Sequence, residues 1–187
     1  MDFTLLAHQI VCEYLRPGEI AIDATVGNGH DAKFLAELVG PTGRVYGFDV
    51  QPAAIARAEE MLAGCPTVSL FLADHAEMAG RLPADLWERV GAVMFNLGYL
   101  PRGDRTISTS TASTVRACDD ALSLLRPGGV LTVMAYRGHP GGREETEAVR
   151  ACFRRLPAKE FAFQETPASA VPTCPVLFVV RKLGIMS

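Results

Sequence analysis

The chain has 187 residues, with 18 Lys and Arg against 21 Asp and Glu, a formal charge of −3. With 49% hydrophobic and 21% charged residues, the composition excludes a disordered chain, a collagen-like repeat and a low-complexity scaffold. No apolar run reaches the roughly 18 residues that cross a bilayer, and the N-terminus lacks the pattern of a signal peptide. We therefore expect one domain, spanning residues 1–187, in the cytoplasm and with no membrane partner.

Charge is unevenly distributed along the chain. Residues 1–99 carry 6 basic and 13 acidic groups, whereas residues 100–187 carry 12 and 8. A basic half can meet phosphate even when the whole protein is acidic, although chance produces such an asymmetry equally well. The five cysteines are far apart and form no C-x-x-C pair, which predicts reduced thiols and no metal site.

Apolar runs of strand length alternate with helical segments along the whole chain. The first five predicted strands each lead into a helix, which gives right-handed parallel crossovers, whereas a loop alone joins the last two. We predict an α/β fold with a seven-stranded, mostly parallel sheet, an antiparallel end and helices on both faces. The predicted strands are Glu19–Ala24, Gly43–Asp49, Thr67–Ala73, Val90–Asn96, Val130–Tyr136, Glu160–Glu165 and Val176–Lys182. The predicted helices are Thr4–Leu15, Asp31–Val39, Pro52–Leu62, His75–Leu82, Ser108–Leu125 and Arg143–Leu156.

Glycines follow the first predicted strand, where a nucleotide-shaped ligand would bind. Gly27, Gly29 and Ala32 satisfy G-x-G-x-x-A between a strand and a helix, and Asp49 closes the second strand 20 residues after Gly29. Ligands of open parallel sheets bind beyond the carboxyl ends of the strands, where such a carboxylate accepts from ribose hydroxyls. The pair predicts a nucleoside cofactor; the structural alternative is a tight turn, with Asp49 capping the helix at Pro52.

Asp23, four residues before the first glycine, separates two cofactor classes. Its carboxylate would repel the pyrophosphate of NAD(P) but can pair with the ammonium and sulfonium of S-adenosylmethionine. The charge therefore favours the methyl donor and leaves the dinucleotide as the alternative. Asp74, with His75 beside it just past the third strand, can accept from an adenine amino group or cap the next helix.

The fourth predicted strand ends in Asn96 and is followed by Tyr99. An amide oxygen and a backbone carbonyl can accept both N–H bonds of an amine and aim its lone pair at a methyl group, while an aromatic face contacts the incoming base. This pair indicates nitrogen methylation. Carbon-5 methylation of pyrimidines fits less well, because no cysteine lies near a strand end that opens into this site.

The loop after the fifth strand, Tyr136–Gly142, supplies an imidazole and backbone amides that could hold an anion. An aliphatic amine with a pKa of about 10.4 would cost about 4.6 kcal/mol to deprotonate at pH 7, so a base or desolvation must help. His139 and Asp104 are the candidate bases. His8 and His30 are expected to serve structure or to line the site.

Together these motifs resemble the small class I methyltransferases first catalogued as rRNA methylases, over nearly the whole chain. The motifs are Asp23–Asp31, Val45–Gln51, Phe95–Pro101 with Gly103-Asp104, and Gly138–Gly142 with Glu144-Glu145. Members of the family use S-adenosylmethionine to convert 5-aminomethyl-2-thiouridine at the tRNA wobble position to 5-methylaminomethyl-2-thiouridine. Arg137 departs from the pattern because a proline is expected there, and Ala73–Glu77 matches it only loosely.

The resemblance implies a Rossmann-like fold, S-adenosyl-L-methionine as cofactor and the tRNA anticodon region as partner. The cofactor-binding candidates are Asp23, Thr25, Gly27, Asn28, Gly29, Asp49, Gln51, Asp74, His75 and Asn96. The catalytic candidates are Asn96, Tyr99, Asp104 and His139. The substrate-binding candidates are Tyr99, Arg102, Arg105, Tyr136 and His139, and Arg116 is a further contact to the anticodon backbone.

Three other functions stay open at the level of sequence. They are a small-molecule N-methyltransferase on the same scaffold, an NAD(P)-binding oxidoreductase, and an RNA-binding module with a vestigial pocket. The catalytic fold uses almost all of the 187 residues, so tRNA recognition is expected from the rim of the site or from the second subunit of a homodimer.

Overall fold

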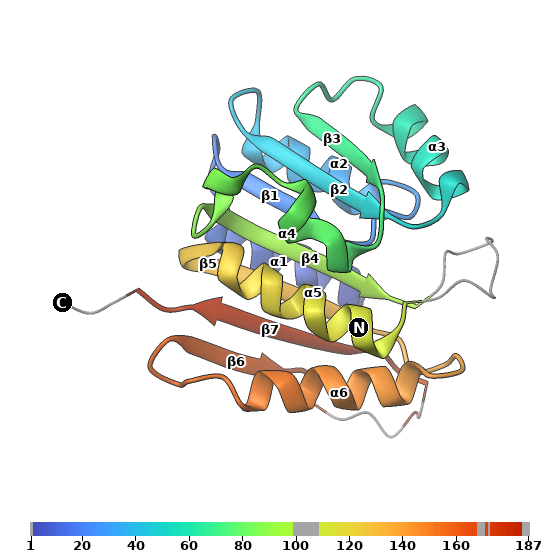
Figure 1. Ribbon diagram of the computed structural model, residues 1–187, viewed down its shortest axis with the longest axis vertical. Helices are drawn as coiled ribbons and strands as arrows, with labels where there is room; N and C mark the ends of the chain where they lie inside the picture. The colour runs from blue at the N-terminus through green and yellow to red at the C-terminus, as the bar shows by residue number, and fades with distance from the viewer. Residues whose placement is uncertain (1, 99–108, 168–170, 172, 185–187) are drawn as a thin grey trace.

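The computed structural model describes residues 2–98, 109–167, 171 and 173–184. Seven strands form one sheet in the order β3-β2-β1-β4-β5-β7-β6 (Figure 1). Pairs among the first five strands are parallel, and β7 is antiparallel to both β5 and β6, as predicted. The strands are β1 Ile20–Asp23, β2 Arg44–Asp49, β3 Val68–Leu72, β4 Val90–Leu97, β5 Leu125–Ala135, β6 Phe161–Glu165 and β7 Val176–Lys182.

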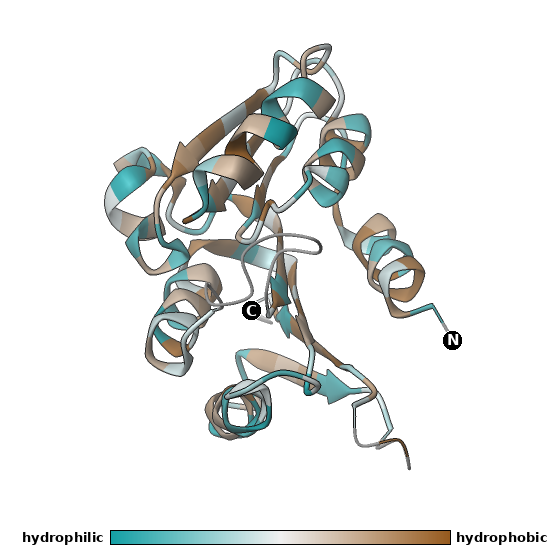
Figure 2. Cartoon of the chain, turned by 90° about the vertical axis from the view of Figure 1, so that its right-hand side faces the viewer, coloured by the Kyte–Doolittle hydropathy of each residue, from teal (hydrophilic) through white to brown (hydrophobic). Residues whose placement is uncertain are grey.

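Helices cover both faces of the sheet, with α4 and α5 in front of it and α1 and α2 behind it in Figure 1 and on opposite sides in Figure 2. Neighbouring strand residues therefore pack in opposite layers: Ala21 joins the core beneath α1 and α2, and Ile22 the core beneath α5 and α6. Strands that are buried on both faces explain the continuous apolar runs of the sequence. The helices are α1 Phe3–Tyr14, α2 His30–Val39, α3 Pro52–Met61, α4 Met78–Arg81, α5 Thr111–Leu124 and α6 Gly142–Arg154, with 3₁₀ turns at His75–Glu77 and Ala84–Leu86.

Two predicted elements differ from the structure in type or by more than three residues. The segment expected as one helix over His75–Leu82 is a 3₁₀ turn, in which Oδ1 of Asp74 accepts from the Ala76 amide at 2.8 Å, followed by the four-residue α4. Strand β5 begins at Leu125, before the Pro-Gly-Gly turn signal, because Leu125 pairs with Val90 and the register then shifts so that the next pair is Ala92 with Val130.

The strand order reverses between β1 and β4, because the chain runs outward from β1 through β2 and β3 and then returns to the other side of β1. The carboxyl ends of β1 and β4 therefore diverge into loops on opposite faces, which opens a crevice between them. Among the described residues, no helix is long and apolar enough to cross a membrane. Nor does this part of the chain gather three or more His, Cys, Asp or Glu side chains as a metal site.

Candidate active site

A cavity of about 720 Å³ lies at this crevice, at the carboxyl ends of β1, β2, β4 and β5. Its volume suits a nucleoside-sized ligand together with part of a second molecule. The sequence-predicted residues on its wall are Thr25, Gly27, Asn28, Asp49, Gln51, Asp74, His75, Asn96, Tyr136 and His139. Four further candidates, Tyr99, Arg102, Asp104 and Arg105, lie outside the described residues.

Asp49 closes the loop that follows β1. Its Oδ2 accepts from the amide of Gly27 and its Oδ1 from the amide of Gln51, both at 2.9 Å. The N-cap of α3 is Gln51, which makes no side-chain capping bond, so Asp49 is not the cap of that helix. Each carboxylate oxygen keeps further acceptor capacity, so Asp49 can also meet hydroxyl groups of a bound ribose.

Gly29 lets α2 begin close against α3. Its φ is +84°, and a Cβ at this position would lie 3.2 Å from Cα of Ala58. Any other residue here would strain the backbone, because φ is positive, and would bring its Cβ too close to the backbone of α3. Gly29 itself is not on the cavity wall, so it shapes the loop rather than touching the cavity.

Asp23 is fully buried and is not among the residues that line the cavity. Its Oδ1 accepts from the Thr25 amide at 3.2 Å, whereas its Oδ2 has no hydrogen-bond partner among the described residues. Burial raises the pKa of Asp23 well above 3.8, and the negative charge of Asp31 raises it further. Within the Asp23–Asp31 motif, the carboxylate residue that does line the wall is Asp31, to which the sequence assigned no role.

Asn96 is held from both ends at the tip of β4. Its backbone N–H donates to Oγ1 of Thr25 at 2.6 Å, and its side-chain Nδ2 donates to Oδ2 of Asp31 at 2.6 Å. These contacts direct the nitrogen of the amide toward Asp31. No hydrogen bond among the described residues uses the side-chain oxygen of Asn96, Oδ1, which stays available as an acceptor at the cavity.

Asp31 has a second partner, His8 of α1. Nε2 of His8 lies 2.7 Å from Oδ1 of Asp31, and its ring stacks on Phe34 with 3.8 Å between the centroids. The sequence left His8 with a structural or lining role and gave no signal for this pair. An acidic residue in the first turn of a helix is common for reasons of charge alone, so only the fold distinguishes Asp31.

His139 and Tyr136 form the part of the cavity wall that follows β5. Nδ1 of His139 donates to the carbonyl of Pro140 at 3.0 Å. The backbone of Gly142 fits closely beneath them, since a Cβ there would lie 2.5 Å from the Tyr136 carbonyl oxygen and 2.7 Å from Nε2 of His139. Burial raises the pKa of Tyr136 above 10, and the charge of Asp31 adds to that shift.

His75 lies on the wall beneath the third strand end. Its ring is buried and meets Phe95 edge-on, with 5.5 Å between the centroids. Burial lowers the pKa of His75 below 6.5, against the raising effect of the Asp74 charge. The imidazole is therefore neutral at pH 7 and can serve as a hydrogen-bonding group for a ligand without a charge.

Glu145 is a buried carboxylate that belongs to the motifs of the resemblance but was given no role from the sequence. Its side chain accepts from the hydroxyl of Thr109 at 2.8 Å and from that of Thr114 at 2.6 Å. Thr109 in turn accepts from the Gly98 amide at 3.1 Å, and its own amide donates to the Gly98 carbonyl at 3.0 Å. Glu145 thus ties α6 to the end of β4 and the start of α5 beside the cavity.

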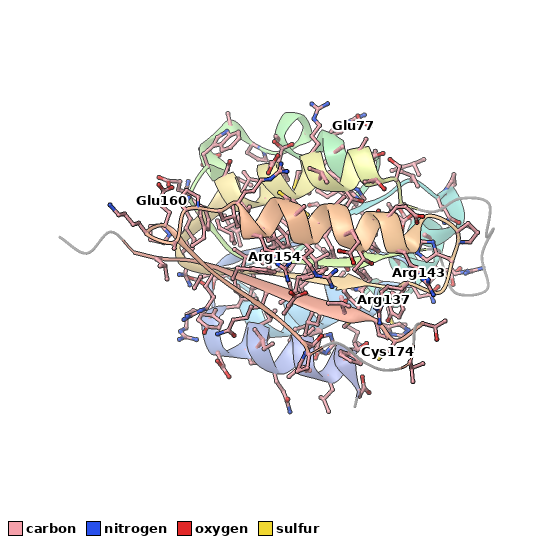
Figure 3. All side chains as sticks on the ribbon, turned by 90° about the horizontal axis from the view of Figure 1, so that it is seen from below. Glu77, Arg137, Arg143, Arg154, Glu160 and Cys174 are labelled. Atoms are coloured by element: carbon pink, nitrogen blue, oxygen red, sulfur yellow. The ribbon has the colours of Figure 1, made fainter. Side chains whose placement is uncertain are left out.

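Arg137, which stands where a proline was expected, ties two loops together. Its Nε donates to the carbonyl of Cys174 at 2.9 Å, and Figure 3 shows the two residues at the same end of the molecule. Nη2 donates more weakly, at 3.4 Å, to the carbonyl of Val171. The neighbouring Thr173 lines the cavity, so the arginine holds the β6–β7 connection against its wall.

Residues 45–182, well over half of the chain, match the model of the family described as "Putative rRNA methylase". The chain belongs to this family. This match agrees with the resemblance that the motifs indicated. The chain is also similar to a protein of Arabidopsis thaliana named tRNA (mnm(5)s(2)U34)-methyltransferase, chloroplastic. That protein is 35% identical over 96% of this chain and 69% of its own length.

Two solved structures share the fold at similar identity. One, a protein of the same description from Clostridium thermocellum, is 38% identical with a TM-score of 0.90 and covers 96% of this chain and 97% of its own. The other, a "putative methyltransferase" of Streptococcus mutans in complex with SAH, is 34% identical with a TM-score of 0.85 over 96% and 97% of the two chains. This member of the rRNA methylase family is therefore a methyltransferase with a Rossmann-like fold, and its cofactor is S-adenosylmethionine rather than a dinucleotide.

Proposed function

We propose that the protein is an RNA N-methyltransferase that methylates the amine of 5-aminomethyl-2-thiouridine at the wobble position of tRNA. The observation that carries the proposal is the fixed amide of Asn96 at the cavity, with its nitrogen turned to Asp31 at 2.6 Å. An amide oxygen presented in this way accepts an amine N–H and directs the lone pair. The name of the Arabidopsis relative supports the choice of nucleoside.

The residues on the wall suit the cofactor. The glycine loop with Asp49 would hold the nucleoside, and the Asp74–His75 corner would meet the adenine. Asp23 is buried behind this wall, so we assign it no contact with the cofactor. When bound, S-adenosylmethionine supplies an activated methyl group. Thr25, Asn28 and Gln51 complete the proposed cofactor-binding wall, since all three line the same cavity. Asn96 also lines this cavity, and we assign its amide to the substrate amine.

On the substrate side, the amine nitrogen must first give up a proton, at a cost of about 4.6 kcal/mol at pH 7 for a group with a pKa of about 10.4. The nitrogen then forms the new N–C bond as the C–S bond breaks, and the sulfur keeps that electron pair. We assign substrate contact to Tyr136 and His139, and proton acceptance to His139, which lies on the wall. Tyr99 and Asp104 remain candidate catalytic residues from the sequence.

The proposal includes the anticodon region as the RNA partner, contacted by Arg102, Arg105 and Arg116. Arg116 is exposed on α5, one helical turn past Ser113 of the cavity wall. Phosphate contacts of this kind release counterions, so the affinity for tRNA should fall steeply as salt rises. A small-molecule substrate would show little such dependence.

The test is to incubate the purified protein and labelled S-adenosylmethionine with tRNA from a strain that accumulates the aminomethyl nucleoside. We expect the 5-methylaminomethyl nucleoside in tRNA digests, with one equivalent of S-adenosylhomocysteine. A protein that binds the cofactor yet leaves the nucleoside profile unchanged would contradict the proposal. The Asn96→Ala variant is the matched control, and full activity of that variant would show that the amide is not part of the reaction.

A further inference from the structure

His8 and Asp31 are not among the predicted site residues, yet their pair contacts Asn96 at the cavity. We propose that His8 and Asp31 are positioning residues that fix the side-chain amide of Asn96 in one orientation, with its carbonyl oxygen presented to the substrate amine. The inference rests on the proposed N-methylation and assigns that reaction two residues from the first helix and the start of the second.

The contacts form one chain across three elements. Nε2 of His8 lies 2.7 Å from Oδ1 of Asp31, and Oδ2 of Asp31 accepts from Nδ2 of Asn96 at 2.6 Å. Asp31 and Asn96 both line the cavity, and the Asp31 residue is only 8% exposed. His8 is not on the wall, so any effect it has on the reaction passes through Asp31.

The orientation matters because the two ends of an amide have opposite hydrogen-bonding character. The terminal torsion of Asn is broad and two-fold, so a free side chain would present either its oxygen or its NH₂ group. An NH₂ group facing the substrate would oppose the N–H bonds of the amine and offer nothing to accept them. A carboxylate only accepts, so Asp31 favours the orientation in which Asn96 turns its nitrogen to Asp31 and its oxygen away.

His8 fixes Asp31 in turn. The imidazole donates to Oδ1, and the ring itself is held by stacking on Phe34 with an interplanar angle of 6°. The helix that carries it is anchored at its N-terminus by Asp2, whose Oδ1 accepts from the amides of Thr4 and Leu5. A carboxylate with one oxygen tied to each neighbour has little freedom to rotate, which keeps the direction of Oδ2 constant.

The test is a double-mutant cycle on the full chain, with turnover of tRNA, KM for tRNA, cofactor affinity and thermal midpoint measured for each variant. We expect His8→Ala to lower kcat about tenfold, the value of one hydrogen bond to a charged group, while KM and cofactor affinity change less than about threefold. In the Asn96→Ala background the same substitution should have little further effect, because the group that it positions is gone. Gln9→Ala, an exposed change on the same helix, is the matched control and should leave every value unchanged.

Asp31 is tested by a severe and a conservative change. Asp31→Ala should lower kcat at least as much as His8→Ala, and Asp31→Asn should recover most of the loss, because an Asn carbonyl can still accept from Asn96. Equal losses for His8→Ala with and without Asn96 would overturn the inference, since a general structural defect is additive. A loss of cofactor affinity in Asp31→Ala with normal kcat at saturating cofactor would also overturn it, and would make Asp31 a cofactor ligand.

A second measurement does not depend on the substrate. In ¹⁵N-labelled protein, the two Nδ2 protons of Asn96 should have widely separated chemical shifts, because one is held by Asp31, and Asp31→Ala should bring them together. Failure of the wild-type protein to methylate tRNA would contradict the proposed function alone. A free amide signal in the wild-type protein would contradict this inference alone.

Discussion

At the ends of β1 and β2 the cavity wall is made by backbone amides that converge on one carboxylate, whereas at the end of β4 it is made by side chains that bond to other side chains. In the first region, here the glycine side, Asp49 accepts from Gly27 and Gln51, and the groups come from one compact motif. In the second, the amide side, Asn96 meets a partner 65 residues away in the sequence. The glycine side should therefore tolerate distant changes, while the amide side depends on several elements that must be in place together.

The largest effect on the amide side is expected from removing Glu145, which supports that side from α6. Glu145→Ala leaves the buried hydroxyl of Thr114 without an acceptor and removes the acceptor of the Thr109 hydroxyl. We expect the free energy of unfolding to fall by about 3 kcal/mol, as measured by urea denaturation. Glu145→Gln keeps one acceptor oxygen and should lose less; equal losses would show that the hydroxyls do not depend on Glu145.

The glycine side is tested by Asp49→Ala. The variant loses two hydrogen bonds to one charged group, both at 2.9 Å, and frees the loop after β1. We expect about 100-fold weaker binding of S-adenosylmethionine by calorimetry, since each bond to a charge contributes about 1.5 kcal/mol or more. Asp49→Asn, which keeps an acceptor, should bind better than the alanine variant, and unchanged affinity in Asp49→Ala would place the cofactor elsewhere.

The amide side separates from the glycine side in Asn96→Ala. We expect kcat for tRNA to fall about 30-fold through lost orientation of the amine, with cofactor affinity within about threefold of the wild type. Calorimetry and single-turnover kinetics give the two values. A large loss of cofactor affinity with normal turnover would show instead that Asn96 binds the cofactor, as the glycine side does.

Asp23 is buried outside the cavity lining, and its ionised form destabilises the folded protein. Because its pKa is raised, the stability it contributes is complete below pH 3.8 and is lost as the pH rises through its folded-state pKa. At pH 7, Asp23→Asn should therefore raise the free energy of unfolding by about 1 kcal/mol. Denaturation at pH 7 and at pH 4 checks this, since the gain should shrink at the lower pH; a variant less stable than wild type at pH 7 would contradict it.

The smallest effect concerns His75, on the cavity wall just past the end of β3. Its pKa is lowered by burial, so the unfolded chain takes up a proton first as the pH falls. The stability that it contributes is complete above pH 6.5 and declines as the pH drops toward its folded-state pKa, by less than about 1 kcal/mol between pH 6.5 and 5.5. His75→Asn should remove this slope, and an unchanged pH profile would assign the titration to another group.

How much was predictable differs between the two sides. The G-x-G-x-x-A pattern and Asp49 predicted which residues meet at the glycine side, because a loop that follows a strand and opens a helix has few conformations and its partner closes the next strand. Asn96 was found from its place at a strand end. Asp31 and Glu145 were not assigned roles, and His8 was expected only to serve structure or to line the site, because a histidine on a helix and acids in first turns have ordinary local explanations. Asp23 was expected to meet the ligand, yet its side chain is buried away from the cavity lining.

The sequence by itself determined the alternation of strands and helices, the parallel sheet with its antiparallel end, and the family, since these depend on local pattern and short motifs. Only the tertiary structure decided which carboxylate of the Asp23–Asp31 motif lines the cavity and how the amide of Asn96 is turned. Those choices depend on contacts between α1, α2 and β4, and on burial that sets apart Asp23 and Asp31 within one short motif. The direction of the Asn96 amide is set by a hydrogen-bond partner that lies 65 residues away along the chain, so no local pattern in the sequence reveals it.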